Sequence, residues 1–213
     1  NARQMVIAWT DGIPNAVHPL LRVPSLLAIN DGAFDAENAR AIREMGLSSK
    51  ADDSASIGKF GLGMKSVFYL SEVFFFVAFD ENGKPFDADL RNPWSADKDG
   101  LHSNWDDLDA TDIGRIASHV QSLAMSSRWE SLALSSRWFC LWLPLRRQCD
   151  LNGIDPIEPY YPGEKAPVEL LGPVQVQQLS TLLPMLSHLL RVEFRIGDAP
   201  DDEPVALAEL GGP

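Results

Sequence analysis

The stretch Ile57-Gly58-Lys59-Phe60-Gly61-Leu62-Gly63-Met64-Lys65-Ser66-Val67-Phe68 carries the strongest signal for the fold. Three glycines fall within six residues, and the apolar run that continues through Tyr69 and Leu70 is typical of a buried helix. Glycine lets backbone N–H groups approach a ligand, and a helix N-terminus adds unpaired donors and a positive dipole end. The pattern predicts a phosphate-binding loop. Alternatively, the glycines form a tight turn that lets a helix pack closely on a sheet.

Lysines accompany this stretch on both sides. Lys59 and Lys65 flank the glycines, and Lys50 precedes them after a small polar pair. Each ammonium group either contacts a phosphate or lies in solvent.

Composition sets the class of protein. The chain has 213 residues, of which 45% are hydrophobic and 23% charged, so one globular domain over residues 1–213 is expected. A net charge of -12 disfavours nucleic acid as a partner. Cys140 and Cys149 have neither metal-ligand spacing nor a disulfide framework, which favours a reducing compartment. With the cysteine pattern, the lack of an apolar run of transmembrane length leads us to expect a cytoplasmic domain. No metal site is expected within the chain.

A polar turn follows the second predicted strand. The apolar segment 25–29 leads directly into Asn30-Asp31-Gly32. Polar residues at a strand end, followed by glycine, often form the floor of a ligand site, although a simple turn has the same pattern.

The remaining pattern predicts alternating strands and helices. Strands are expected at residues 4–9, 73–79, 85–90, 138–146 and 190–196, the last of them half-exposed, with a hairpin turn at Asn82-Gly83. Helices are expected at 35–45, with Asp35 as N-cap, from Asp112 as N-cap to Leu123, and at 174–183. Residues 91–136 contain a polar stretch that we interpret as an insertion, and 150–172 read as irregular.

The stretch from Ile57 to Val73 resembles the second glycine motif of the GHKL ATPases, which include gyrase, MutL, the histidine kinases and the ninety-kilodalton heat-shock chaperone. The similarity is greatest to the chaperone branch with its sacsin-type repeats. It implies an ATP lid whose backbone wraps the phosphates, with the nucleotide bound by residues Asn30, Asp31, Gly32, Lys50, Gly58, Lys59, Phe60, Gly61, Leu62, Gly63, Met64, Lys65 and Ser66.

The resemblance also exposes departures around the base. The family motif is Asp-x-Gly, and Asn30 stands at the position of the acid, so either Asn30 or, after a one-residue shift, Asp31 contacts adenine. Phe34 replaces a further glycine of the family. A Pro-Leu-Arg segment at 144–146 resembles the end of a family strand that is preceded by a Gly-Thr pair whose threonine approaches the adenine. Trp138 and Phe139 replace this pair, so the threonine contact is not carried over to this chain.

The resemblance implies an α+β fold, a two-layer α/β sandwich with a mixed, mostly antiparallel sheet and helices on one face, known as the Bergerat-type fold. The family's first helix carries the catalytic acid and the magnesium-binding asparagine, and residues 1–4 resemble its end. We therefore interpret the chain as a fragment that lacks this helix, with no catalytic residue assigned.

The expected function is ATP binding with lid closure as a conformational switch, and Mg-dependent hydrolysis in the complete protein. Closure would change contacts with other domains, with a protein partner or within a dimer. Two alternatives stay open. In the first, the domain has kept the fold as a nucleotide-free interaction scaffold. In the second, it is a DNA-transaction ATPase of the MutL or MORC kind, which its acidic charge disfavours.

Overall fold

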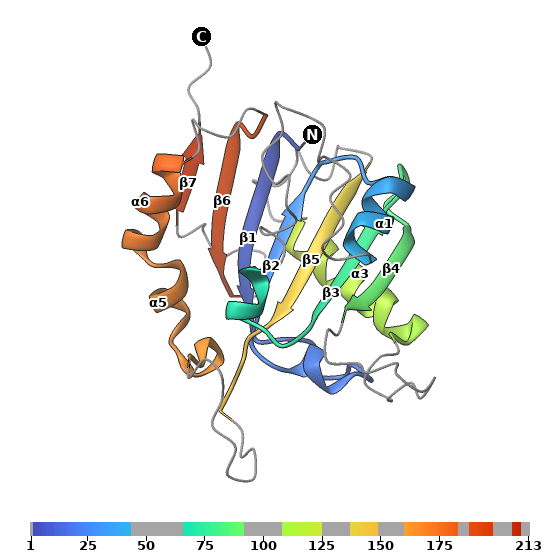
Figure 1. Cartoon of the computed structure of the whole chain (residues 1–213), viewed down its shortest axis with the longest axis horizontal. Coiled ribbons are helices and arrows are strands. Elements are labelled where there is room, and N and C mark those ends of the chain that lie inside the picture. Colours follow the sequence, from blue (N-terminus) through green and yellow to red (C-terminus); the bar gives the residue numbers. More distant parts are fainter. Residues whose placement is uncertain are drawn as a thin grey trace.

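Seven strands form one mixed sheet in the order β4-β3-β5-β2-β1-β6-β7 (Figure 1). The structure is a computed structural model that describes residues 2–43, 66–91, 108–124, 137–148, 160–182, 188–197 and 206–209. The strands are β1 (Gln4–Thr10), β2 (Ser25–Asn30), β3 (Phe74–Phe79), β4 (Pro85–Arg91), β5 (Trp138–Pro144), β6 (Arg191–Ile196) and β7 (Ala206–Glu209). The helices are α1 (Ala36–Arg43), α3 (Ala110–Ala124), α5 (Pro167–Leu171) and α6 (Pro173–Leu182), with 3-10 turns η1 (Pro19–Arg22), η2 (Ser66–Tyr69) and η3 (Pro162–Glu164).

Strand pairing confirms the α+β class with a mixed, mostly antiparallel sheet. Within the described residues, β1 and β6 are the one parallel pair, and the other five pairs are antiparallel. The hairpin between β3 and β4 turns where the sequence predicts it, since Gly83 has a φ of 70°, a conformation that suits glycine. All six residues of β3 are buried, as expected for a strand covered on both faces.

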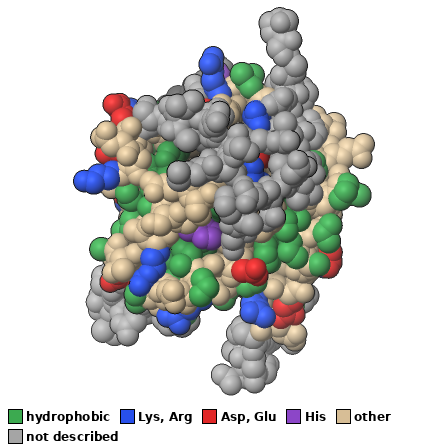
Figure 2. Space-filling view, turned by 180° about the vertical axis from the view of Figure 1, so that it is seen from behind, with side chains coloured by type: hydrophobic (Ala, Val, Ile, Leu, Met, Phe, Trp, Pro, Cys, Tyr) green, Lys and Arg blue, Asp and Glu red, His purple; other side chains and the backbone are tan. Residues whose placement is uncertain are grey.

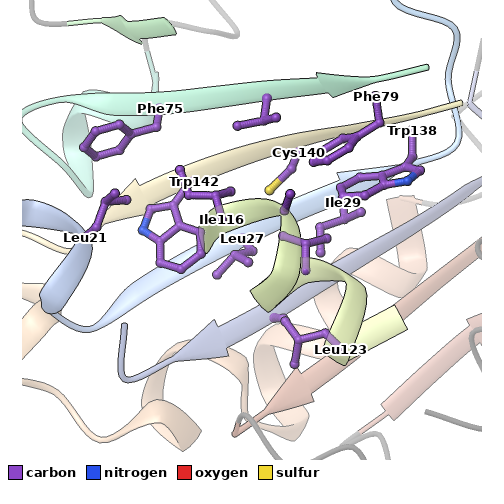
Figure 3. Packing of buried hydrophobic residues seen from close by; sticks show 14 of the residues in the cluster. Leu21, Leu27, Ile29, Phe75, Phe79, Ile116, Leu123, Trp138, Cys140 and Trp142 are labelled. Carbon is purple, nitrogen blue, oxygen red and sulfur yellow. The ribbon is translucent and has the colours of Figure 1, made fainter. Parts of the chain in front are cut away.

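One face of the sheet is closed by α3, and we call it the α3 face. Its strands supply Leu27, Ile29, Phe75, Cys140 and Trp142, and α3 supplies Ile116, Val120 and Leu123, as Figure 3 shows for most of these residues. The listed side chains are each at most 1% exposed. Helix α3 lies within the 91–136 range, so this part of the expected insertion contributes to the core.

The opposite face carries α1 and η2, and we call it the α1 face. Its core residues include Leu26, Phe74, Phe76 and Leu141 from the strands, and Leu171 and Val176 from α5 and α6. Figure 1 shows α1 in front of the sheet and α3 behind it. The expectation of helices on one face is therefore wrong. The reason is that β1, β2, β3 and β5 carry apolar residues at both odd and even positions, so each face needs a cover.

Asp112 lies inside helix α3 and does not cap it, contrary to the sequence-based prediction. The cap is Asp109, whose carboxylate accepts the Thr111 N–H at 2.7 Å. The fully buried Asp112 carboxylate instead accepts the N–H groups of Val17 at 2.8 Å and His18 at 2.6 Å. Helix α3 therefore holds the loop between β1 and β2 through one carboxylate.

Strand β6 is buried on both faces, so the prediction of a half-exposed strand is wrong. It lies inside the sheet between β1 and β7. Glu193 and Arg195 are only 2% and 4% exposed, and the Arg195 Nε donates to Glu193 Oε1 at 2.6 Å. Because the two charges pair, a polar alternation is compatible with burial. The short helix α5 and the strand β7 were not predicted from the sequence.

Candidate functional site

The Asn30-Asp31-Gly32 turn lies at the end of β2, in the middle of the sheet. Side chains alternate along β2, and Leu26 and Ala28 belong to the α1 face, so Asn30 is on that face as well. In the strand register Asn30 is the partner of Phe139 on β5. Two of the positions that the sequence analysis linked to a base contact are therefore neighbours on one face.

The Asn30 side chain closes a local turn. The Gly32 N–H donates to Asn30 Oδ1 at 2.9 Å, which fixes the orientation of the amide because only its oxygen can accept. A Cβ atom at Gly32 would lie 2.8 Å from this oxygen, so a side chain at this position would require the Asn30 amide to shift. Among the described residues, Asn30 Nδ2 has no hydrogen-bond partner, and Oδ1 retains a second lone pair.

The Asp31 side chain is hydrogen-bonded to the backbone at the start of the neighbouring strand β1. Its Oδ1 accepts the backbone N–H groups of Arg3 at 2.7 Å and Gln4 at 3.0 Å. These bonds join the end of β2 to the start of β1. Of the two residues considered for the base contact, Asp31 has this structural task, and Asn30 keeps an amide Nδ2 without a partner among the described residues.

Phenylalanine rings fill the α1 face beside Asn30. Phe34, from the segment between β2 and α1, stacks on Phe139 with a centroid distance of 4.9 Å and an interplanar angle of 14°. Phe76 lies 6.1 Å from Phe139 and 5.7 Å from Phe34. We call Phe34, Phe76 and Phe139 the aromatic cluster. Phe86, which is 53% exposed, extends it with its ring centroid 6.5 Å from that of Phe34.

The segment after the glycine motif packs on the same face. Ser66 begins η2, and the next two residues, Val67 and Phe68, pack against the core of the α1 face. Arg146, at the end of β5, donates to the carbonyl of Phe68 and forms an ion pair with Glu72 at 2.5 Å. The predicted site residues Lys50, Gly58, Lys59, Phe60, Gly61, Leu62, Gly63, Met64 and Lys65 lie outside the described residues.

Helix α1 is joined to the edge strand β4 by charged groups. The Arg43 guanidinium contacts Asp87 at 2.6 Å and Asp89 at 3.0 Å, and its Cζ lies 5.4 Å from the Phe76 ring centroid. Hydrogen bonding to Asp87 raises the pKa of Arg43, so the side chain stays charged.

The N-terminal end of α1 is capped by Asp35. Its carboxylate accepts the Asn38 N–H at 2.8 Å, which confirms the predicted N-cap.

Sequence reasoning missed the ring contact of Phe34 and the charged contacts of Arg43. For the contacts of Arg43, the available signal was the alternation of Asp87, Asp89 and Arg91 on one strand. For the ring contact of Phe34, the resemblance marked Phe34 and Phe139 only as departures from the family pattern. It gave no sign that the two rings would meet.

Charges on the described surface are mixed. Figure 2 shows Lys and Arg side chains dispersed among Asp, Glu and hydrophobic side chains on the face seen from behind. Over the residues that the structure describes, no group of three or more His, Cys, Asp or Glu is placed to hold a metal ion. None of the helices described is long and apolar enough to cross a membrane.

Comparison with known protein families gives one finding. The family model for the Sacsin domain matches residues 11–204. The chain belongs to the Sacsin domain family. The match covers both the Asn30-Asp31-Gly32 turn and the glycine motif of this sacsin domain. Among curated proteins, no sequence matches the chain.

Proposed function

We propose that this sacsin domain is a GHKL-type ATP-binding domain. One observation carries the proposal. Three segments far apart in the sequence, which stand where the resembled family contacts its nucleotide, lie on one face of the sheet. They are the turn at Asn30, the strand position of Phe139 and the η2 segment that begins at Ser66.

Each residue has a proposed role. Asn30 contacts the adenine amino group through the second lone pair of Oδ1, and Gly32 permits the turn that presents it. Asp31 holds β1 in place beside the site. The backbone from Gly58 to Ser66 binds the phosphates, with Lys50, Lys59 and Lys65 as cations. Magnesium binds through the nucleotide and a residue that is not among those assigned here.

ATP binding then acts as a conformational switch in this proposal. Closure of the glycine segment over the γ-phosphate changes what neighbouring domains or a protein partner contact, and hydrolysis in the complete protein resets the switch. As part of this proposal, the switch operates in the cytoplasm.

A nucleotide-free scaffold is the second candidate function. The observation that favours it is the aromatic cluster, because Phe34 covers the ring of Phe139 directly beside Asn30. In this alternative the fold is kept for protein contacts alone.

A thermal unfolding experiment on the full-length protein tests the proposal. Ligand that binds only the native state stabilises it by about 2.7 kcal/mol at a concentration one hundred times the Kd. For a domain of this size the melting temperature should then rise by about 5–10 °C with MgATP. Isothermal titration calorimetry gives the Kd directly.

Two matched glycine substitutions sharpen the test. Gly61→Ala should weaken MgATP binding at least about tenfold, because the backbone of the motif must approach the phosphates closely. Gly114→Ala on α3 is the control, since a Cβ there meets no atom within 4 Å, and it should leave binding unchanged. Absence of any shift of the unsubstituted protein at millimolar MgATP would leave the scaffold function.

A further inference from the structure

The contact between Phe34 and Phe139 lies where a base bound to Asn30 would have to lie. Phe139 is the register partner of Asn30 on the adjacent strand, and both residues are on the α1 face. Directly opposed side chains of antiparallel strands have Cβ atoms about 5 Å apart. A planar group hydrogen-bonded to the Asn30 amide therefore lies over or against the ring of Phe139.

The ring of Phe34 takes that space. Its centroid is 4.9 Å from that of Phe139, and the rings are within 14° of parallel. A base inserted between them would need about 7 Å, which is two carbon contact distances of about 3.5 Å each. The base and the Phe34 ring therefore cannot occupy this space together.

Several contacts stabilise Phe34 in this position. Its ring also meets Phe76, and the guanidinium of Arg43 lies over the Phe76 ring. Phe34 directly precedes Asp35, the N-cap of α1. The far end of the same short helix is bonded to Asp87 and Asp89 through Arg43. The helix and the aromatic cluster thus set the position of the ring together.

We propose that Phe34 is an internal competitor for the base and sets the nucleotide affinity of the domain. The inference rests on the proposed function. In the nucleotide-free state the ring stacks on Phe139, and nucleotide binds only when the ring has moved off. The apparent Kd is then the intrinsic Kd divided by the fraction of molecules whose base site is open. If the stacked state outnumbers the open state by about ten to one, affinity falls by about tenfold.

Removal of either ring tests the inference by calorimetry with MgATP on the full-length protein. Phe34→Ala removes the competitor, and Phe139→Thr removes the surface on which it stacks. Both should lower the Kd at least about tenfold. Phe86→Ala is the matched control, because it removes a ring of the same size from the outer edge of the cluster, away from Asn30. It should change the Kd by less than about twofold.

The outcomes separate this inference from the proposed function. If the unsubstituted protein binds MgATP and both variants bind it equally or more weakly, the competitor role is overturned while ATP binding stands. If the unsubstituted protein does not bind and Phe34→Ala does, the competitor role stands and ATP binding by the natural sequence fails. Absence of binding in all proteins overturns both. Far-ultraviolet circular dichroism checks that each variant is folded. If Phe34→Ala does not fold, the Kd of Phe139→Thr tests the competitor role.

Discussion

The two faces of the sheet are built in different ways. On the α3 face, strand residues such as Leu27, Phe75 and Trp142 are fully buried under a fifteen-residue helix. On the α1 face, the central strands present Met5, Ile7, Ala28 and Phe139, which are only partly buried. Both faces contain fully buried residues, such as Phe74 and Phe76 on the α1 face, but the α1 face also leaves partly exposed apolar surface next to polar groups, as ligand sites do.

The largest expected effect tests this division. Phe75→Ala on the α3 face should cost about 3–5 kcal/mol in the free energy of unfolding, since it leaves a cavity at a fully buried site. Phe139→Ala on the α1 face should cost only about 1–2 kcal/mol, because the ring is half-buried. Denaturant unfolding with both variants gives the comparison. Equal costs would show that the two faces do not differ in stability.

An effect of intermediate size is expected for Asp112 of α3, which binds the loop between β1 and β2. Burial raises the pKa of Asp112, but the N–H groups of His18 and Val17 and the Arg115 guanidinium outweigh it, so the pKa lies below the usual value. Asp112→Ala should cost about 3 kcal/mol at pH 7, because it leaves these donors without an acceptor.

The pH dependence of the same contact has a definite sign. The folded-state pKa of Asp112 is lowered, so its stabilisation is fully present above the unfolded-state pKa of about 4. It is lost as the pH falls through the folded-state value. The difference in unfolding free energy between the natural protein and Asp112→Ala should therefore shrink in acid. A difference that is constant from pH 7 to pH 2 would contradict this role of the carboxylate.

The smallest expected effect concerns the α1 face. Arg43 is 38% exposed and Asp87 22% exposed, so their ion pair should contribute about 1 kcal/mol and weaken with salt. A double-mutant cycle of Arg43→Ala and Asp87→Ala measures the interaction free energy. Arg43→Lys is the control that keeps the charge but loses the two-pronged contact. A coupling above about 3 kcal/mol would mean that α1 is held as firmly as α3.

Much of the fold was predictable because its signals are local. The apolar run of β3, the Asn82-Gly83 hairpin and the Asp35 cap depend on residues within a few positions of each other. The predictions failed where contacts with distant segments determine the role of a residue or the burial of a strand. Asp112 is a residue type that often caps helices, yet its carboxylate accepts the backbone N–H groups of His18 and Val17, which are 94 and 95 positions away. Strand β6 alternates like an exposed strand, yet Val192 and Phe194 pack in the same core as Leu171 and Val176 of α5 and α6, and the buried charges of Glu193 and Arg195 pair with each other.

The candidate site divides in the same way. The Asn30-Asp31-Gly32 turn and its position after an apolar strand were visible in the sequence. The different tasks of Asn30 and Asp31 were not, because the donors from Arg3 and Gln4 come from another strand. For the glycine motif, which lies outside the described residues, the assignment to phosphate binding stays a prediction.

By itself the sequence determined the strands other than β7, the main helices, the glycine motif and the polar turn, since each depends on backbone preference and on the spacing of apolar residues over a few positions. The tertiary structure alone decided that helices cover both faces, that Glu193 and Arg195 pair in the interior, and that the ring of Phe34 lies on Phe139. These contacts join residues that the path of the chain brings together, and no local pattern encodes that path.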